Sequence, residues 1–286
     1  MLINFRTTKA LVICLFLFHA SNSFGMLKAL NTAATGMTAQ EVNVNTISQN
    51  IANVNTVGYK KARTEFEDLL YETVQDAGSR SSNNSLYNVG VQVGSGAKVS
   101  ATRKEFTQGS PQITNRPFDM MISGDGFFGI ILPNGEVRYS RDGAFNVDAG
   151  GNLVTKHGYK VFPSLTLPPA TKSVSIAEDG TVEVFLNGQV EPINSGQIPI
   201  FTFVNPVGLR NAGGNLYQVT RSSGQPIQNI AGQNNAGSIM QGSLETSNVS
   251  VMNEMTSLIK AQRAYEMNSK VMGVADQMLQ TVNNIR

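Results

Sequence analysis

Apolar residues near both ends of the chain recur in alternating steps of three and four residues. The N-terminal repeat comprises Leu30, Ala33, Met37, Val44, Ile47, Ile51 and Val54, with Gln40 as its polar member. The C-terminal repeat comprises Ala264, Met267, Val271, Val274, Met278 and Ile285, with Thr281 in the polar position. This spacing places the side chains on one face of a helix, as in a coiled coil. The pattern therefore predicts an N-terminal helix with its cap over residues 26–58 and a C-terminal helix over residues 242–286, which together form a coiled-coil-like core.

Between these ends, apolar and polar residues alternate in steps of two and are interrupted by turn sequences. The pairs Asn134-Gly135, Gly150-Gly151, Asp179-Gly180 and Asn187-Gly188 each follow and precede an apolar run. Such dipeptides adopt the backbone conformations that tight hairpins require. We therefore predict an antiparallel β domain over residues 101–241, inserted between the two helices, and an α+β fold.

Residues 59–100 connect the predicted N-terminal helix to the β domain. They contain the polar run QDAGSRSSNNS at residues 75–85, which has the composition of a linker. We expect an extended or mobile segment here.

The first 25 residues differ from the remainder of the chain. Arg6 and Lys9 precede the apolar run ALVICLFLF, and small polar residues follow it. That order is typical of a secretory signal, although nine apolar residues are too few to span a bilayer as a helix. The alternative is a mis-set start, with Met26 as the first residue of the protein.

Composition limits the chemistry that residues 26–286 can perform. Without Arg6 and Lys9 they carry 20 basic and 20 acidic residues, and without Cys14 they carry no cysteine. A balanced charge gives no electrostatic basis for nucleic-acid binding, so no nucleic-acid partner is expected. The absence of cysteine excludes disulfides and thiolate metal sites in this part of the chain.

An asparagine-rich stretch, NIANVNTVGYK, lies where the N-terminal helix is expected to end. Asparagine and glycine both tolerate the left-handed backbone conformation that commonly follows a helix. Neutral amides supply neither an acid nor a base near pH 7. We therefore interpret Asn50, Asn53, Asn55, Gly58 and Tyr59 as a helix cap and turn.

Catalytic and cofactor-binding patterns are weak. The glycines of GVQVGSGA are not followed by a predicted helix, as a dinucleotide-binding fingerprint requires. His157, the one histidine downstream of Met26, lies beside a turn glycine, and the pair Glu178 and Asp179 consists of adjacent residues whose side chains diverge. We predict no catalytic residue, no cofactor and no metal site, and hence no enzyme.

Four segments of the chain carry a family resemblance. They are SQNIANVNTVGYKKARTEFEDLLY, QGSPQITNRPFDMMISGDGFFGI, YSRDGAFNVDAGGNLVT and QGSLETSNVSVMNEMTSLIKAQRAYEMNSKVM. In order and spacing they resemble the bacterial flagellar axial proteins of the rod and hook, over essentially all of residues 26–286. Within that family the chain is most similar to the distal rod member, and proximal rod and hook members are the alternatives.

The resemblance implies a structural subunit of the flagellar basal body. Such a subunit self-assembles into a helical tube, the distal rod, which spans the periplasm, transmits torque from motor to hook and encloses the export channel. The implied partners are sister copies, proximal rod and hook-side axial proteins, surrounding ring proteins and the flagellar type III export apparatus. This export route does not use a cleaved signal, so the resemblance favours the mis-set start. Residues 75–96 are then the expected place of a rod-specific contact that makes the shaft rigid.

Burial of one apolar stripe does not offset the conformational entropy lost when both helices become ordered. We therefore expect the terminal helices to fold against sister copies, which would also cover the flanking residues Leu27, Met252, Met255, Leu258 and Ile259. Small residues that could permit close helix packing, or merely fill the core, are Ala33, Ala34, Gly36, Ala261, Ala264 and Gly273. A secreted β-rich adhesin or binding module is the alternative of another class, but it does not account for heptads at both ends.

Overall fold

The computed structural model describes residues 4–82, 85–187 and 191–284. The chain divides into two compact units. The helical unit contains residues 1–48, 63–103 and 255–286, and the β unit contains residues 49–62 and 104–254. The chain therefore passes between the units four times.

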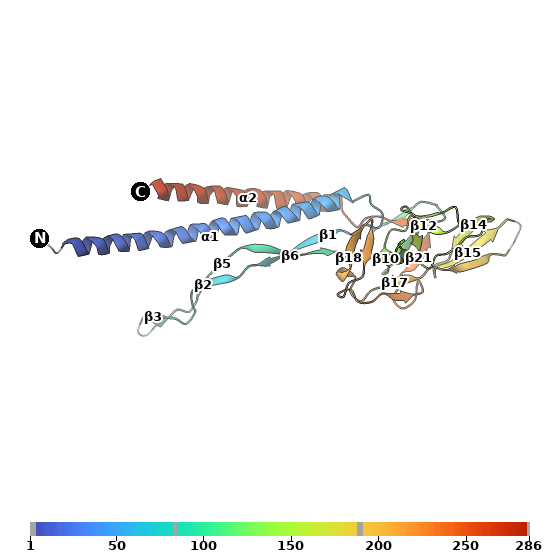
Figure 1. The fold of residues 1–286 in the computed structure, drawn as a ribbon, viewed down its shortest axis with the longest axis horizontal. Coiled ribbons are helices and arrows are strands. Elements are labelled where there is room, and N and C mark those ends of the chain that lie inside the picture. The colour runs from blue at the N-terminus through green and yellow to red at the C-terminus, as the bar shows by residue number, and fades with distance from the viewer. Residues whose placement is uncertain (1–3, 83–84, 188–190, 285–286) are drawn as a thin grey trace. The chain divides into compact units, whose positions relative to one another are not determined.

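Two long helices dominate the helical unit (Figure 1). Helix α1 spans Asn4–Ala52 and helix α2 spans Val251–Asn284, and residues 49–52 and 251–254 of these helices belong to the β unit. They lie side by side and run in opposite directions, and they contact each other at Gly36, where an added Cβ would lie 2.7 Å from Asn268 Nδ2. Among the described residues, no helix is both long enough and apolar enough to cross a membrane.

A long β hairpin, made of three consecutive pairs of strands, comes after α1 in the sequence and completes the helical unit; we call it the β ribbon. Its strands are β1 (Ala62–Asp68), β2 (Tyr71–Gln75), β3 (Arg80–Ser82), β4 (Ser85–Leu86), β5 (Val91–Gly94) and β6 (Ala97–Lys104). Strand β1 pairs with β6, β2 with β5, and β3 with β4, so the chain runs out along one strand and returns along the other. Thr64 Oγ1 donates a 3.1 Å hydrogen bond to Thr46 Oγ1 of α1, and Gly96 lies against Thr35. The segment expected to be extended or mobile is thus built from paired strands.

The β unit consists of short antiparallel strands. They are β7 (Pro111–Ile113), β8 (Met120–Ser123), β9 (Phe128–Ile131), β10 (Val137–Ser140), β11 (Phe145–Val147), β12 (Leu153–Thr155), β13 (Lys160–Val161), β14 (Thr171–Ile176), β15 (Thr181–Leu186), β16 (Ile193–Gln197), β17 (Ile200–Thr202), β18 (Arg210–Gly213), β19 (Leu216–Gln218), β20 (Ile227–Asn229), β21 (Ser238–Gln241) and β22 (Ser243–Glu245), with a 3-10 turn at Pro206–Gly208. Seven of them form a sheet in the order β11-β12-β13-β9-β10-β19-β18, and three form a second sheet in the order β14-β15-β16. The pairs β7–β22, β8–β21 and β17–β20 complete the unit.

Three of the predicted hairpins are confirmed. Strands β9 and β10 pair across Asn134-Gly135, β11 and β12 across Gly150-Gly151, and β14 and β15 across Asp179-Gly180. The glycine in the second position of each pair has a positive φ, which is +81° at Gly135. Gly188 of the fourth predicted turn lies outside the described residues.

Two apolar clusters fill the β unit. The larger is aliphatic with a Phe128–Phe145 pair, and both of these rings are almost fully buried. The smaller is aromatic and comprises Phe127, Tyr139, Phe201, Leu209 and Tyr217. These rings and that of the partly buried Phe203 meet edge to face at centroid distances between 4.9 and 5.7 Å, the arrangement that the quadrupoles of aromatic rings favour.

The α+β class is confirmed by an N-terminal helix, a C-terminal helix and a strand-rich middle. The predicted coiled-coil-like core is not confirmed: on α2, Met267, Val271 and Val274 are between 48% and 62% exposed in the single chain. Helix α1 begins at Asn4, within the expected leader, and Ile285 and the side chains of residues 1–26 lie outside the described part of the chain.

Candidate functional site

Helix α2 has a covered face formed mainly by small or polar side chains. Ala261 and Ala275 are 3% and 6% exposed. The partly covered members of the same three-four repeat are Leu258, Ala264, Asn268, Met272 and Leu279. Small side chains let helix backbones approach closely, and Asn268 meets Gly36 of α1 on this face.

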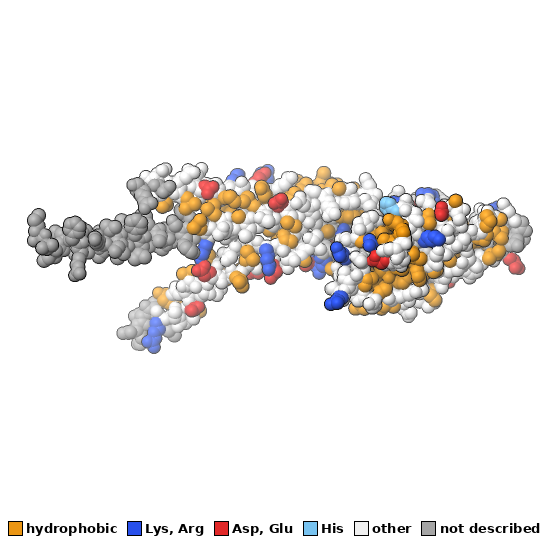
Figure 2. All heavy atoms as spheres, viewed as in Figure 1, with side chains coloured by type: hydrophobic (Ala, Val, Ile, Leu, Met, Phe, Trp, Pro, Cys, Tyr) orange, Lys and Arg blue, Asp and Glu red, His pale blue; other side chains and the backbone are white. Residues whose placement is uncertain are grey.

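A second face of α2 is apolar and exposed. Its members are Met252, Met255, Ile259, Met267, Val271, Val274, Met278 and Val282, and each is between 41% and 75% exposed. In Figure 2 hydrophobic side chains gather along α2. We call these eight residues the outer face of α2. A contiguous apolar surface on an isolated chain is typical of an interaction site.

The predicted self-assembly residues divide between covered and exposed positions. On α1, Ala33 and Ile47 are buried, and Leu30, Met37, Val44 and Ile51 are partly covered. On α2, Met267, Val271, Val274 and Met278 belong to the outer face, whereas Ala264 is partly covered. The stripe of α1 is therefore covered within one chain, and most of the stripe predicted on α2 is not.

Asn50 is the centre of a hydrogen-bond cluster in the β unit. It is 2% exposed, and its Oδ1 accepts hydrogen bonds from the Ala62 amide at 2.9 Å and the Tyr59 hydroxyl at 3.2 Å. Its Nδ2 donates to the Ala62 carbonyl at 2.8 Å and to Glu254 Oε2 at 3.1 Å. The whole amide is thus satisfied, and one side chain ties together three segments of the chain. This role goes beyond the cap expected from the sequence.

The residues after Asn50 form the turn that ends α1. Asn53 Nδ2 donates to the Gln49 carbonyl at 2.8 Å, and Asn55 is exposed. Gly58 has φ +66°, and a Cβ there would lie 2.6 Å from the Arg141 carbonyl carbon. Glycine is required at this point for both its backbone conformation and its close approach to another segment.

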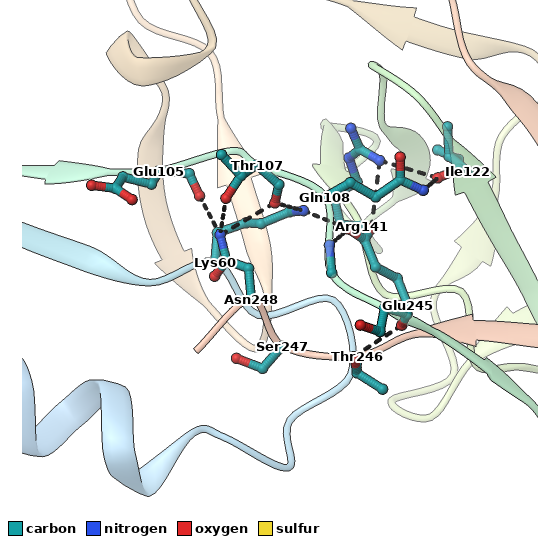
Figure 3. A network of polar contacts seen from close by, with 12 residues as sticks. Lys60, Glu105, Thr107, Gln108, Ile122, Arg141, Glu245, Thr246, Ser247 and Asn248 are labelled. Carbon is teal, nitrogen blue, oxygen red and sulfur yellow. Dashed lines mark hydrogen bonds and ion pairs between the residues drawn. The ribbon is translucent and has the colours of Figure 1, made fainter. Parts of the chain in front are cut away.

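Three buried charges meet beside this turn (Figure 3). Lys60 Nζ lies 2.5 Å from Glu245 Oε1 and donates to the Thr107 carbonyl at 2.8 Å. Arg141 Nη1 lies 3.5 Å from Glu245 Oε2, and its Nη2 donates to the Gly124 carbonyl at 2.7 Å. These three side chains, which we call the buried triad, are at most 3% exposed.

The triad is held by charge pairing against a desolvation penalty. Burial lowers the pKa of the Lys60 ammonium and of the Arg141 guanidinium, and the Glu245 carboxylate opposes both shifts. Glu245 Oε1 also accepts a 2.8 Å hydrogen bond from the Gly109 amide. A buried carboxylate with several donors stabilises its partners only while all of them are present.

Further contacts join the segments around the triad. Lys104 Nζ donates to the Lys60 carbonyl at 2.7 Å and lies 4.1 Å from the centroid of the Tyr59 ring. Burial lowers the pKa of Lys104 to about 8. Asn248 Oδ1 accepts from the Lys61 amide at 2.7 Å, and its Nδ2 donates to the Glu105 carbonyl at 2.8 Å. We call Asn50, the buried triad, Tyr59, Lys104 and Asn248 the polar cluster.

The polar cluster lies within the β unit and close in sequence to every passage of the chain into the helical unit. Those passages occur after residues 48, 62, 103 and 254. Asn50, Lys60, Lys104 and Asn248 each lie within about a dozen residues of one of them. Hydrogen bonds and ion pairs of the polar cluster therefore connect the four segments of the β unit that lie next to these passages.

Sequence reasoning did not find the buried triad, although each member lies in a motif that carried the family resemblance. Lys60 follows Gly58-Tyr59, Arg141 lies in YSRDGAF, and Glu245 lies in QGSLETS. The sequence feature that pointed to the triad is the presence of a charged residue inside each of three separate family motifs. A single sequence does not show which of these charges pair.

Across residues 4–82, 85–187 and 191–284, no three or more His, Cys, Asp or Glu side chains are grouped to hold a metal ion. His157 lies in a small pocket with Lys156, Asp142 and Tyr159. Its ring is tilted against Tyr159, with centroids 6.0 Å apart.

Comparison with known proteins identifies the family. The family model for the flagella basal body rod protein matches residues 30–60, that for the flagellar hook protein FlgE/F/G D1 domain matches residues 121–184, and that for the flagellar basal body rod FlgEFG protein C-terminal matches residues 240–285. The flagellar basal-body rod protein FlgG of Borreliella burgdorferi is 49% identical over 91% of this chain and 99% of its own length. The chain belongs to the family of flagellar basal-body rod proteins. FlgG of Caulobacter vibrioides is 46% identical and FlgG of Bacillus subtilis 35% identical, each over 91% of this chain and 100% of the relative.

Membership of the rod family settles the broad function. The protein is a structural component of the flagellar basal-body rod, and the expectation that it is not an enzyme is confirmed by this family. Rod and hook proteins belong to a multi-subunit flagellar assembly.

Proposed function

We propose that this protein is the subunit of the distal rod and that it self-assembles into a helical tube. The tube transmits torque from the motor to the hook and encloses the export channel. The similarity to proteins named FlgG, which extends over nearly their full length at 35–49% identity, supports the distal rod over its alternatives, a proximal rod or hook subunit. A secreted adhesin does not fit membership of the rod family.

The observation that carries the proposal is the exposed outer face of α2. Its eight apolar side chains are 41–75% exposed in the single chain, so burying them against a neighbour would release a large apolar area from water. A neighbour related by a helical operator buries this face in every copy and leaves the assembly open to growth, which gives a tube instead of a closed ring. In this proposal the coiled-coil-like core forms between copies.

The polar cluster suits a subunit that bears torque. A twisting load reaches the β unit through four covalent connections, and inside that unit their neighbouring segments are hydrogen-bonded to one another. Separating any one segment would break charge-assisted hydrogen bonds in a buried environment, where an unpaired group is costly. The load is therefore shared by the whole cluster.

The β ribbon supports a further contact with neighbouring subunits. Between residues 75 and 96 it exposes the apolar side chains Tyr87, Val89, Val91 and Val93, and Val89 is 78% exposed. This segment is our proposed rod-specific contact that makes the shaft stiff. Proximal rod proteins, hook-side axial proteins, surrounding ring proteins and the export apparatus complete the proposed partners.

The test compares assembly of the full-length chain with that of a variant carrying Val271→Asp and Val274→Asp. Both side chains are about half exposed, so the monomer should keep its helical circular dichroism, while two buried carboxylates per contact should abolish sedimenting polymer. Ser269→Asp, at an exposed position of α2 off the outer face, is the matched control and should assemble normally. Equal assembly of the double variant and the control would reject the proposal.

A further inference from the structure

The outer face of α2 is unusually rich in methionine. Met252, Met255, Met267 and Met278 make up half of its eight residues, and they are 75%, 51%, 62% and 50% exposed. In contrast, Met120 and Met121 in the β unit are at most 2% exposed. The most accessible thioethers of α2 therefore lie on the surface that the proposed assembly must bury.

Exposure decides whether a thioether reacts with a dissolved oxidant. A peroxide or hypochlorous acid transfers one oxygen atom to the methionine sulfur in a two-electron oxidation. The sulfur becomes a sulfoxide, and the peroxide is reduced to water or the hypochlorous acid to chloride and a proton. The product is polar and chiral, whereas methionine is apolar and flexible enough to fill an irregular contact.

Residues 26–286 contain no cysteine, so no thiol in this part of the chain competes for the oxidant. Methionine is therefore the principal readily oxidised side chain in residues 26–286. A sulfoxide on the outer face would have to be buried without a hydrogen-bond partner when two copies meet, which opposes association.

We propose that Met252, Met255, Met267 and Met278 form an oxidation site that controls assembly. Peroxide or hypochlorous acid converts them to sulfoxides in the free subunit and makes that subunit unable to join the tube. In an assembled subunit the same sulfurs are covered and unreactive. A thiol-dependent reductase reverses the change and restores assembly: two thiols are oxidised to a disulfide, and the sulfoxide oxygen leaves as water. This inference rests on the proposed function, because it requires the outer face of α2 to be a contact between copies.

The experiment treats the unassembled full-length chain with hydrogen peroxide, locates the added oxygen by peptide mass spectrometry and then measures assembly by sedimentation. We expect oxidation of the four methionines of the outer face to precede that of Met120 and Met121. The critical concentration for assembly should then rise about tenfold or more. Treatment with methionine sulfoxide reductase should return it to its starting value.

Two variants serve as controls. A chain with leucine at all four positions (Met252→Leu, Met255→Leu, Met267→Leu and Met278→Leu) keeps an apolar outer face and should assemble equally well before and after peroxide. Met240→Leu removes an exposed methionine of the β unit, where the side chain is 43% exposed, and should remain as sensitive as the wild type. A second measurement needs no variant: peroxide added after assembly should oxidise Met240 but spare the four methionines of the outer face.

The possible outcomes separate this inference from the proposed function. Oxidised wild-type chain that assembles at the original concentration would overturn the oxidation site and leave the assembly surface intact. Equal oxidation of the four outer-face methionines before and after assembly would overturn it as well. If the untreated wild-type chain never sediments, the proposed function fails, and the oxidation site with it.

Discussion

Lys60 and Glu245 lie 185 residues apart in the sequence, yet the Lys60 Nζ and Glu245 Oε1 atoms are 2.5 Å apart in the structure. Both side chains are almost completely buried, at 0% and 1% exposure. A single ion pair thereby joins the segment that follows α1 to the segment that precedes α2. Its burial makes it sensitive to the loss of either partner.

Glu245→Gln should destabilise the β unit strongly. The substitution leaves the ammonium of Lys60 and the guanidinium of Arg141 buried without a counter-charge, and breaking a buried pair in this way typically costs about 3 to 5 kcal/mol. Denaturant unfolding followed by near-UV circular dichroism measures the change. Glu178→Gln, an exposed glutamate of the same unit, should change the free energy of unfolding by less than about 0.5 kcal/mol. If both variants unfold at the same denaturant concentration, the triad does not hold the unit together.

Gly58→Ala should be more destabilising than Gly135→Ala, although both glycines have a positive φ. An alanine at either site adopts an unfavourable left-handed conformation, which costs about 1 to 2 kcal/mol. At Gly58 the new methyl group would also lie 2.6 Å from the backbone of Arg141, whereas at Gly135 it meets no atom within 4 Å. Thermal unfolding of the two variants isolates the steric contribution as their difference. A smaller loss for Gly58→Ala would show that the segment of Arg141 can move away.

The pH dependence of stability should show the buried Lys104. Burial lowers its pKa to about 8 in the folded chain, while the unfolded chain keeps the ordinary value of 10.5. Between these values the unfolded state binds more protons, so the free energy of unfolding should rise with pH. The raised pKa of Tyr59 acts in the opposite direction once tyrosine ionises, so the measurement belongs between about pH 8 and about pH 9.5.

Lys104→Met removes the titrating group and is the comparison for that measurement. The variant should unfold with a flatter pH profile over the same interval, because no proton is then released at this position on folding. Lys172→Met, at an exposed lysine of β14, should keep the wild-type slope. A wild-type slope in Lys104→Met would assign the pH dependence to other groups.

The elements that the sequence predicted well are those set by local patterns. The helices follow from apolar periodicity, and the hairpins at Gly135, Gly151 and Gly180 follow from the need for a positive φ. The ribbon of residues 62–104 was less visible, because strand pairing uses backbone groups and can form from a polar sequence.

The covered face of α2 was missed for a different reason. Two three-four repeats coexist on this helix, and hydrophobicity favours the one with Met267 and Val271 as the seam. The structure instead covers the repeat that contains Ala261 and Ala275. Hydrophobicity indicates which face of a helix favours burial, but it does not indicate which neighbour covers that face. In the same way, a single sequence does not show that Lys60 forms an ion pair with Glu245.

Gly273→Ala distinguishes a packing role from an incidental glycine on α2. In the single chain an added Cβ at Gly273 meets no atom within 4 Å, so alanine should stabilise the helix by about 0.5 to 1 kcal/mol through its better helix propensity. If a neighbouring copy approaches the backbone at this glycine, the same methyl group must hinder association. We therefore expect a higher melting temperature for the unassembled chain and a higher critical concentration for assembly. Gly36→Ala is the comparison within the chain, because its methyl group meets the flexible end of Asn268 and should leave assembly unchanged. Improved stability together with unchanged assembly in Gly273→Ala would show that no neighbouring backbone lies against this part of α2.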